Sequence, residues 1–181
     1  MKKIIETVLP LHEIDDSAIA DRARKGHPGN MHLWWNRSPI DSSVALLKAA
    51  LEDDPTERQP DRESLLKDLI QISAGKTGNN FLSGMEFPTV CDPFSGFGGL
   101  TIAAQQLGLR VEAGDLNSVA TLLTKAATEI PARFHNGRAV NPEADNKMYF
   151  GSEGLAADIA YYGEQVKQKV RRFTPGYGCE R

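Results

Sequence analysis

The sequence predicts an α/β protein with a parallel sheet. Short apolar runs alternate with helical patterns between residues 89 and 131, which gives the order strand, helix, strand, helix of a βαβα unit. The first run ends in the glycine-rich turn 96–99, which leads directly into a helical pattern. We expect an irregular or helical segment before this unit and one long helix after it.

The chain up to about residue 40 is predicted to be irregular, because "KGHPGNMHLWWNRSPI" mixes two His, two Trp, two Pro and two Gly. A helix is predicted over 41–51, with one apolar face: Val44, Leu47 and Leu51. Asp61 is predicted to cap a second helix, whose apolar face is Leu65, Leu66, Leu69 and Ile72. The segment "SAGKTGNN" is expected to end that helix as a loop.

The βαβα unit follows. The run 89–91 predicts a buried parallel strand, and the pattern after the glycines predicts a helix that ends at Gly108, with this face: Leu100, Ala103, Ala104 and Leu107. Residues 110–113 are predicted to form the second strand. Asn117 is expected to cap the next helix and Pro131 to end it, with this apolar stripe: Val119, Leu122, Leu123, Ala126 and Ile130.

A long helix is predicted from Ser152 after the polar stretch 132–151. Its apolar residues share one face: Leu155, Ile159, Tyr162, Val166, Val170 and Phe173. Its acidic residues come early and its basic residues late, as the helix dipole favours. The cluster from Lys167 to Arg172 compensates that dipole, and phosphate contact to DNA by the same residues is a further hypothesis.

The composition is that of an ordinary soluble protein of 181 residues, with 40% hydrophobic and 25% charged residues. A net charge of -3 excludes a polycation that coats nucleic acid. Cys91 and Cys179 are far apart, which argues against a disulfide framework or a zinc site. The first ten residues lack the pattern of a signal peptide and no apolar run could span a membrane, so we expect a cytoplasmic protein.

The glycine-rich turn predicts a nucleotide-type ligand. A strand that ends in glycines and leads into a helix directs backbone N–H groups at a ligand, and missing Cβ atoms let the ligand approach. Asp115 follows Gly96 by 19 residues, the offset expected of an acid that binds ribose hydroxyls. The alternative is a tight turn without a ligand. The strand, helix and acid in register favour the ligand.

The residues around the turn narrow the ligand class. Thr101 stands where a dinucleotide-binding turn prefers a small residue, so nicotinamide cofactors fit poorly. Asp92 would repel a phosphate and would attract an ammonium group. S-adenosylmethionine (SAM) carries an ammonium, a sulfonium and a ribose but no phosphate, so it is the favoured ligand. Lys76-Thr77 does not complete a phosphate-binding P-loop, because Ile70 stands where that motif requires glycine.

Several motifs together resemble a known family. "DPFSGFG" is similar to the SAM-binding motif of amino-methyltransferases that act on DNA bases, and "AGDLN" resembles their ribose-binding motif. With "GHPGNMHLWWNRSPI", "EIPARF", "AVNPEA" and "GLAADIAYYG", the chain resembles the N-terminal part of large bacterial adenine-specific DNA methyltransferases. Those proteins begin with a domain of unknown function numbered 1156. The resemblance implies a partial Rossmann-like methyltransferase fold with SAM as cofactor and DNA as partner.

The resemblance also implies roles for residues of this chain. Asp92 would meet the methionine end of SAM, next to Pro93, and Phe94 would pack on the cofactor. Gly96 and Gly98 would let the cofactor approach the backbone, and Thr101 would reach the carboxylate of SAM. Asp115 would bind the ribose, with Leu116 and Asn117 near the adenine. The segment before the first strand would wrap the cofactor through these candidates: His27, Trp34, Arg37 and Pro39.

The catalytic motif of that family is missing. Amino-methyltransferases hold the flipped base with a Pro-Pro-aromatic motif, and this chain has no Pro-Pro; Asn141-Pro142 lacks the second proline and the aromatic residue. We therefore expect no catalytic residue and no metal site here.

The expected parts are a segment at 1–85 on the cofactor side, a SAM-binding unit at 86–150, and a helix and tail at 151–181. The chain would be the SAM-binding N-terminal portion of a larger enzyme that needs its C-terminal catalytic part. Open alternatives are a non-catalytic SAM- or nucleotide-binding module, part of an RNA or protein methyltransferase, and, least favoured, a nicotinamide-dependent oxidoreductase.

Overall fold

The structure, a computed structural model, divides into two compact units, Met1–Thr128 and Glu129–Arg181. The residues described are 2–21, 27–35, 37–55, 59–74, 87–144 and 148–173. The loop expected near residues 75–80, the tail after Phe173 and Cys179 lie outside these residues.

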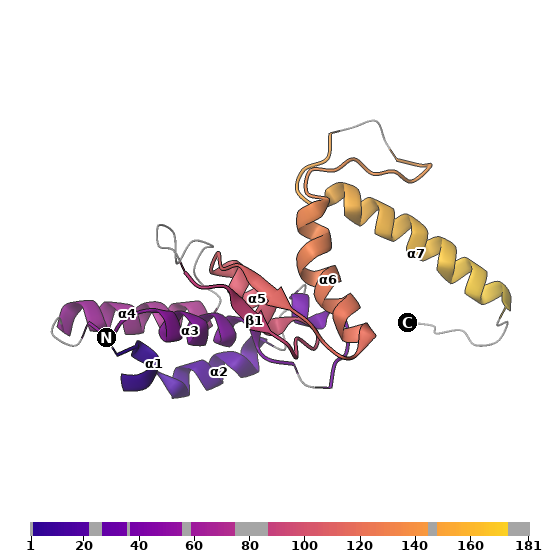
Figure 1. The fold of residues 1–181 in the computed structure, drawn as a ribbon. Helices are drawn as coiled ribbons and strands as arrows, with labels where there is room; N and C mark the ends of the chain where they lie inside the picture. The colour runs from indigo at the N-terminus through magenta and orange to yellow at the C-terminus, as the bar shows by residue number, and fades with distance from the viewer. Residues whose placement is uncertain are drawn as a thin grey trace. The chain divides into compact units, whose positions relative to one another are not determined.

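Helices make up most of the first unit. In chain order its elements are α1 (Ile4–Thr7), α2 (Leu11–Asp21), the short 3-10 helix η1 (Pro28–Asn30), α3 (Ile40–Leu51), α4 (Gln59–Ser73), β1 (Val90–Asp92), α5 (Gly99–Gln106) and β2 (Val111–Ala113). Helix α6 (Ser118–Arg133) begins in this unit and ends in the next (Figure 1). The predicted helices at 41–51 and after Gly98 are confirmed.

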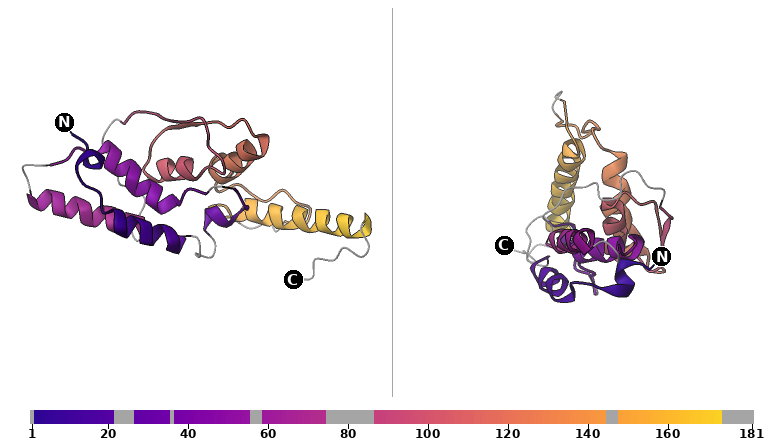
Figure 2. Two further views of the ribbon diagram at one scale, coloured as in Figure 1. Left: turned by 90° about the horizontal axis from the view of Figure 1, so that it is seen from below. Right: turned by 90° about the vertical axis from the view of Figure 1, so that its left-hand side faces the viewer.

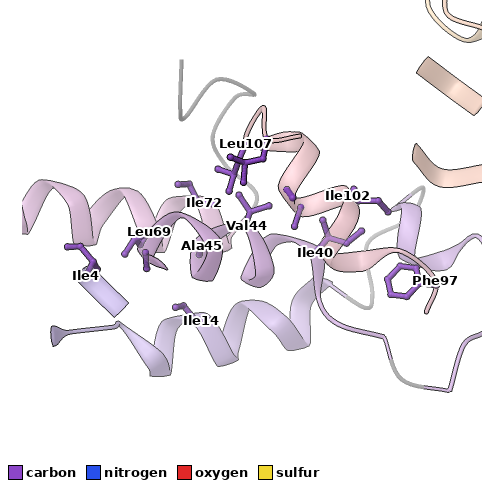
Figure 3. Packing of buried hydrophobic residues seen from close by; sticks show 14 residues of the cluster. Ile4, Ile14, Ile40, Val44, Ala45, Leu69, Ile72, Phe97, Ile102 and Leu107 are labelled. Carbon is purple, nitrogen blue, oxygen red and sulfur yellow. The ribbon is translucent and has the colours of Figure 1, made fainter. Parts of the chain in front are cut away.

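The core of this unit forms around α3, which packs against α1, α2, α4 and α5. Figure 3 shows side chains from these helices pointing toward one another. The buried residues labelled there are Ile4, Ile14, Ile40, Val44, Ala45, Leu69, Ile72, Phe97, Ile102 and Leu107. The core therefore joins the N-terminal helices to α5, the helix that follows the glycine-rich turn.

The two strands pair in parallel, with Val90 opposite Val111 and Asp92 opposite Ala113. Backbone hydrogen bonds continue past the strands, from Gly114 N–H to the Asp92 carbonyl and from Ser95 N–H to the Gly114 carbonyl, each at 2.9 Å. The carboxyl ends of β1 and β2 therefore lie together. The predicted mixed α/β class and parallel pairing are confirmed, in a mostly helical chain with a two-stranded sheet.

Four local predictions are wrong. The first strand is not buried throughout, because Val90 is half-buried and Cys91 is exposed. The segment 11–21, expected to be irregular, is helix α2; its periodicity is weak because Ile14 is the one large apolar side chain that it buries against α3, among those described. Helix α4 begins at Gln59, so Asp61 lies in its first turn and not at its cap; Pro60 suits that turn because no N–H is needed there. Pro131 does not end α6. Proline removes a single donor, and the Phe134 N–H still bonds the Ile130 carbonyl at 3.1 Å.

The second unit consists of the end of α6, a loop and the long helix α7 (Glu153–Phe173), which runs unbroken (Figures 1 and 2). The predicted start at Ser152 is confirmed, since its carbonyl accepts the first helical bond from Ala156 N–H. Asp158 fastens the loop to α7, because it accepts the Val140 and Asn141 N–H groups and the Asn141 side-chain amide at 2.8–3.0 Å. None of the helices described is long and apolar enough to cross a membrane.

Candidate functional site

A cavity of about 300 Å³ opens at the carboxyl ends of β1 and β2. It is lined by Trp34, Ser38, Asp92, Phe94, Ser95, Gly96, Phe97, Gly99, Leu100 and Asp115. Five of these were predicted from the sequence: Trp34, Asp92, Phe94, Gly96 and Asp115. The fold thus brings Trp34, one of the candidates from the N-terminal segment, to the carboxyl ends of both strands. Parallel α/β sheets bind their ligands at this edge.

Asp92 ends β1 and is buried, with 8% of its surface exposed. Its two carboxylate oxygens accept hydrogen bonds from the Phe94 N–H at 3.3 Å and from the Thr101 hydroxyl at 3.5 Å. Thr101 is itself buried in α5 and does not line the cavity. Its hydroxyl therefore contacts the Asp92 carboxylate from outside the cavity.

Asp115 follows β2 and ties the glycine-rich turn to that strand. One carboxylate oxygen accepts the Gly96 N–H at 2.9 Å and the other accepts the Asn117 N–H at 2.8 Å. The backbone hydrogen bonds from Asn117 and then Gly96 lower the pKa of Asp115, against an opposing effect of desolvation. Asp115 is therefore ionised at neutral pH and bonded to the turn.

We expect the amide NMR signals of Gly96 and Asn117 to titrate together, with a midpoint below the ordinary aspartate value of about 3.8. A lowered folded-state pKa stabilises the protein above the unfolded pKa, and that stability is lost as the pH falls through the folded pKa. Asp115→Asn should abolish both amide titrations, and Glu112→Gln on β2 should leave them unchanged. A midpoint above 3.8 would contradict the hydrogen-bonding role.

The glycines of the turn have other protein groups as close neighbours. Gly96 and Gly98 have positive φ values of 54° and 92°, which favour glycine. A Cβ on Gly96 would lie 3.0 Å from the Trp34 indole nitrogen, and one on Gly98 would lie 3.1 Å from the Thr124 hydroxyl oxygen. The turn is therefore packed between the N-terminal segment and α6, and only Gly96 of this pair lines the cavity.

The remaining predicted residues are separate from the cavity lining. Arg37 donates to the Gly29 carbonyl at 2.5 Å and to the Asn30 side chain at 3.3 Å, so it fastens η1. Together with His27 and Pro39 it lines a small neighbouring cavity of about 20 Å³. The others outside the lining are Pro93, Gly98, Thr101, Leu116 and Asn117. Leu116 is fully exposed, as is most of Phe94, so two large apolar side chains follow the ends of the two strands.

Sequence reasoning missed several residues of the site. Ser38, Ser95, Phe97, Gly99 and Leu100 line the cavity, and Phe97 and Ser38 also line its small neighbour. Thr124 donates to the Ser95 hydroxyl at 3.1 Å and to the Gly96 carbonyl at 3.2 Å. The signal for Ser95 and Phe97 was present, because both lie within the glycine-rich motif. Ser38 likewise lies within the motif "GHPGNMHLWWNRSPI", between the candidates Arg37 and Pro39, whereas nothing in the sequence pattern pointed to Thr124.

The charge of the cavity favours a cationic ligand. Asp92 and Asp115 contribute two carboxylates, and none of the described residues that line the cavity is Lys, Arg or His. Trp34 and Phe94 add aromatic surface, which attracts cations through the ring faces. In the part of the chain described, no cluster of three or more His, Cys, Asp or Glu could hold a metal ion. The arrangement suits an organic cation with hydroxyl groups and disfavours phosphate.

Comparison with known protein families identifies a domain in the N-terminal segment. Residues 8–73 match the family described as "Protein of unknown function (DUF1156)". These residues carry a DUF1156 domain, which includes α2, α3 and α4 and ends before β1. No curated protein and no solved structure matches the chain. The DUF1156 domain therefore contributes Trp34 and Ser38 to the cavity, and the residues from the end of β1 onward contribute the carboxylates and glycines.

Proposed function

We propose that the chain is the SAM-binding portion of a DNA adenine-N6 amino-methyltransferase, with its strand–turn–helix–strand segment as part of a Rossmann-like fold. The observation that carries the proposal is the pair of carboxylates, Asp92 and Asp115, in one cavity with the Trp34 indole and the Gly96 backbone. Such a set matches a ligand with an ammonium, a sulfonium and a ribose. It does not match a dinucleotide, whose pyrophosphate Asp92 would repel.

Each group has a defined task in this proposal. Asp92, contacted by the Thr101 hydroxyl at 3.5 Å, would pair with the ammonium group of SAM. Asp115 would accept the ribose hydroxyls while it holds the turn through the Gly96 N–H. Phe94 and Leu116, both exposed, would cover the adenine. When bound, SAM supplies an electrophilic methyl group on its sulfonium, and these residues position that group for transfer to an amine.

The acceptor half of the reaction needs residues that this sequence lacks. A flipped adenine requires hydrogen-bond acceptors and a stacking aromatic ring, and the chain has no Pro-Pro-aromatic motif. Methylation of DNA therefore depends on a C-terminal catalytic partner or segment. The same absence favours a second candidate, a SAM- or nucleotide-binding module without catalysis of its own. A role in an RNA methyltransferase shares the same cofactor site.

Isothermal titration calorimetry of the chain with SAM tests the proposal. We expect saturable binding of SAM and no binding of NAD at the same concentration, because phosphate is repelled. Asp115→Ala should weaken SAM binding about tenfold or more, since a charge-assisted hydrogen bond to the ligand is lost. Glu112→Ala is the matched control. It removes a carboxylate from the exposed strand β2 just before the site and should bind SAM as the wild type does.

Two outcomes would reject the cofactor assignment: no heat from the wild-type chain with SAM, or equal loss of affinity in both variants. Amide NMR spectra of Asp115→Ala would show whether the turn itself has changed, because Asp115 also bonds Gly96 and Asn117. Methyl transfer to DNA should be undetectable with the isolated chain. Transfer by this chain alone would reject the requirement for a separate catalytic part.

A further inference from the structure

Helix α7 presents an exposed apolar face. Its large apolar side chains follow a spacing of three or four residues, and five of the six are exposed: Ile159, Tyr162, Val166, Val170 and Phe173. Ile159 is 63% and Val166 is 60% exposed. We define these five residues and the half-buried Leu155 as the α7 stripe. A contiguous exposed stripe of this kind marks an interaction surface.

The loop that packs on α7 covers a different face. Its contacts are with Asp158, through Val140 and Asn141, and with the buried Gly154. A polar cavity of about 440 Å³ lies along this other side and is lined by Ala157, Tyr161, Glu164 and Gln168 among others. Residues 157, 161, 164 and 168 lie opposite 155, 159, 162 and 166 at 3.6 residues per turn. The α7 stripe therefore takes no part in these contacts between the loop and α7 within unit Glu129–Arg181.

We propose that the α7 stripe is the interface of a homodimer in which α7 pairs with α7 of a second copy in antiparallel orientation. The spacing of the stripe supports this partner. Leu155 and Phe173 are equally far from residue 164, and so are Tyr162 and Val166, while Ile159 and Val170 lie five and six residues from it. In an antiparallel pair centred there, Leu155 meets Phe173 of the other copy and Tyr162 meets Val166. Such three-and-four spacing is that of helices that pack along a seam.

The charges of α7 select the antiparallel direction. The first part of the helix carries Glu153 and Asp158, and the last part carries Lys167, Lys169, Arg171 and Arg172. Antiparallel pairing places the acidic part of one helix along the basic part of the other. Parallel pairing would bring the basic ends of the two helices together, which is unfavourable.

Sedimentation equilibrium over about a hundredfold range of protein concentration tests the dimer. The wild-type chain should pass from monomer to dimer, and Val166→Glu should raise the dissociation constant about a hundredfold, because two carboxylates would be buried at the centre of the seam. Gln168→Glu is the control: it adds the same charge on the polar cavity face and should leave the dissociation constant unchanged. Circular dichroism of both variants verifies that α7 remains helical.

Cross-linking tests the direction. In a chain with Cys91→Ser and Cys179→Ser, we mix molecules carrying Leu155→Cys with molecules carrying Phe173→Cys and oxidise them. Antiparallel pairing predicts disulfides between the two kinds of molecule, and parallel pairing predicts disulfides within each kind. The proposal is overturned by a monomeric wild type, by a dimer that Val166→Glu leaves intact, by disulfides within each kind only, or by a monomer that floats with anionic vesicles through this stripe.

Discussion

Replacing Gly98 by alanine should lower the free energy of unfolding of unit Met1–Thr128 by about 2–4 kcal/mol. Two costs combine at this position. The backbone has a φ of 92°, which strains any residue with a Cβ. The added Cβ would also lie 3.1 Å from the Thr124 hydroxyl oxygen and 3.2 Å from the Thr124 Cα. A backbone atom of α6 cannot move without shifting the helix, so the contact is not easily relieved.

Two other glycines separate these costs. Gly108 has a φ of 78° but no atom within 4 Å of the position that an added Cβ would take, so Gly108→Ala measures backbone strain alone, about 1 kcal/mol. Gly114 has open space and no positive φ, so Gly114→Ala should be nearly neutral. Urea unfolding followed by tryptophan fluorescence provides the measurement, because both tryptophans lie in this unit. Equal losses for Gly98→Ala and Gly108→Ala would show that packing on Thr124 has no part in the effect.

Replacing Gly154 by alanine should detach the loop before α7 from the helix, at a cost of about 2–3 kcal/mol. Gly154 is buried in the first turn of α7, and an added Cβ would overlap the Gly137 carbonyl oxygen and lie 3.0 Å from the Ala139 nitrogen. All the nearest atoms belong to the backbone of the loop. Amide hydrogen exchange should therefore speed up at Val140 and Asn141, whose N–H groups bond Asp158.

Gly163 is the matched control in the same helix. No atom lies within 4 Å of the position where its Cβ would be, so Gly163→Ala should stabilise α7 by about 0.5–1 kcal/mol, as alanine does in a helix. Both variants are compared at low protein concentration, where association through the α7 stripe is minimal. Unchanged exchange at Val140 and Asn141 in Gly154→Ala would contradict the close packing of the loop on α7.

The local order of elements was predictable because local patterns specify it. The apolar spacing after the glycines predicted α5, and Asn117 was correctly predicted to cap α6, where its side-chain oxygen accepts the Val119 N–H at 2.9 Å. The pairing of Asp92 and Asp115 in one site also followed from the sequence. Adjacent parallel strands bring their carboxyl ends to one edge, so residues at the ends of the two strands must meet there.

Helix α2 and the end of α6 depended on longer-range contacts. The α2 segment has little amphipathic pattern, and its helix is stabilised by the burial of Ile14 against α3 and by the Ser42 hydroxyl, which donates to the Ile14 carbonyl at 3.3 Å. Proline usually ends a helix, yet the turn of α6 around Pro131 keeps its backbone hydrogen bond from Phe134 N–H to the Ile130 carbonyl. Propensity is a weak guide where tertiary packing or neighbouring hydrogen bonds compensate.

By itself, the sequence determined a βαβα order, a glycine-rich turn after the first strand, and two carboxylates at the same sheet edge. Only the tertiary structure decided what surrounds them. It placed Trp34 beside Gly96 and Thr124 beside Gly98, and it separated Arg37 into a second cavity. The physical reason is the range of the interactions. Hydrogen bonds of turns and caps join residues close in the chain, whereas side-chain packing joins residues whose separation in sequence carries no periodic signal.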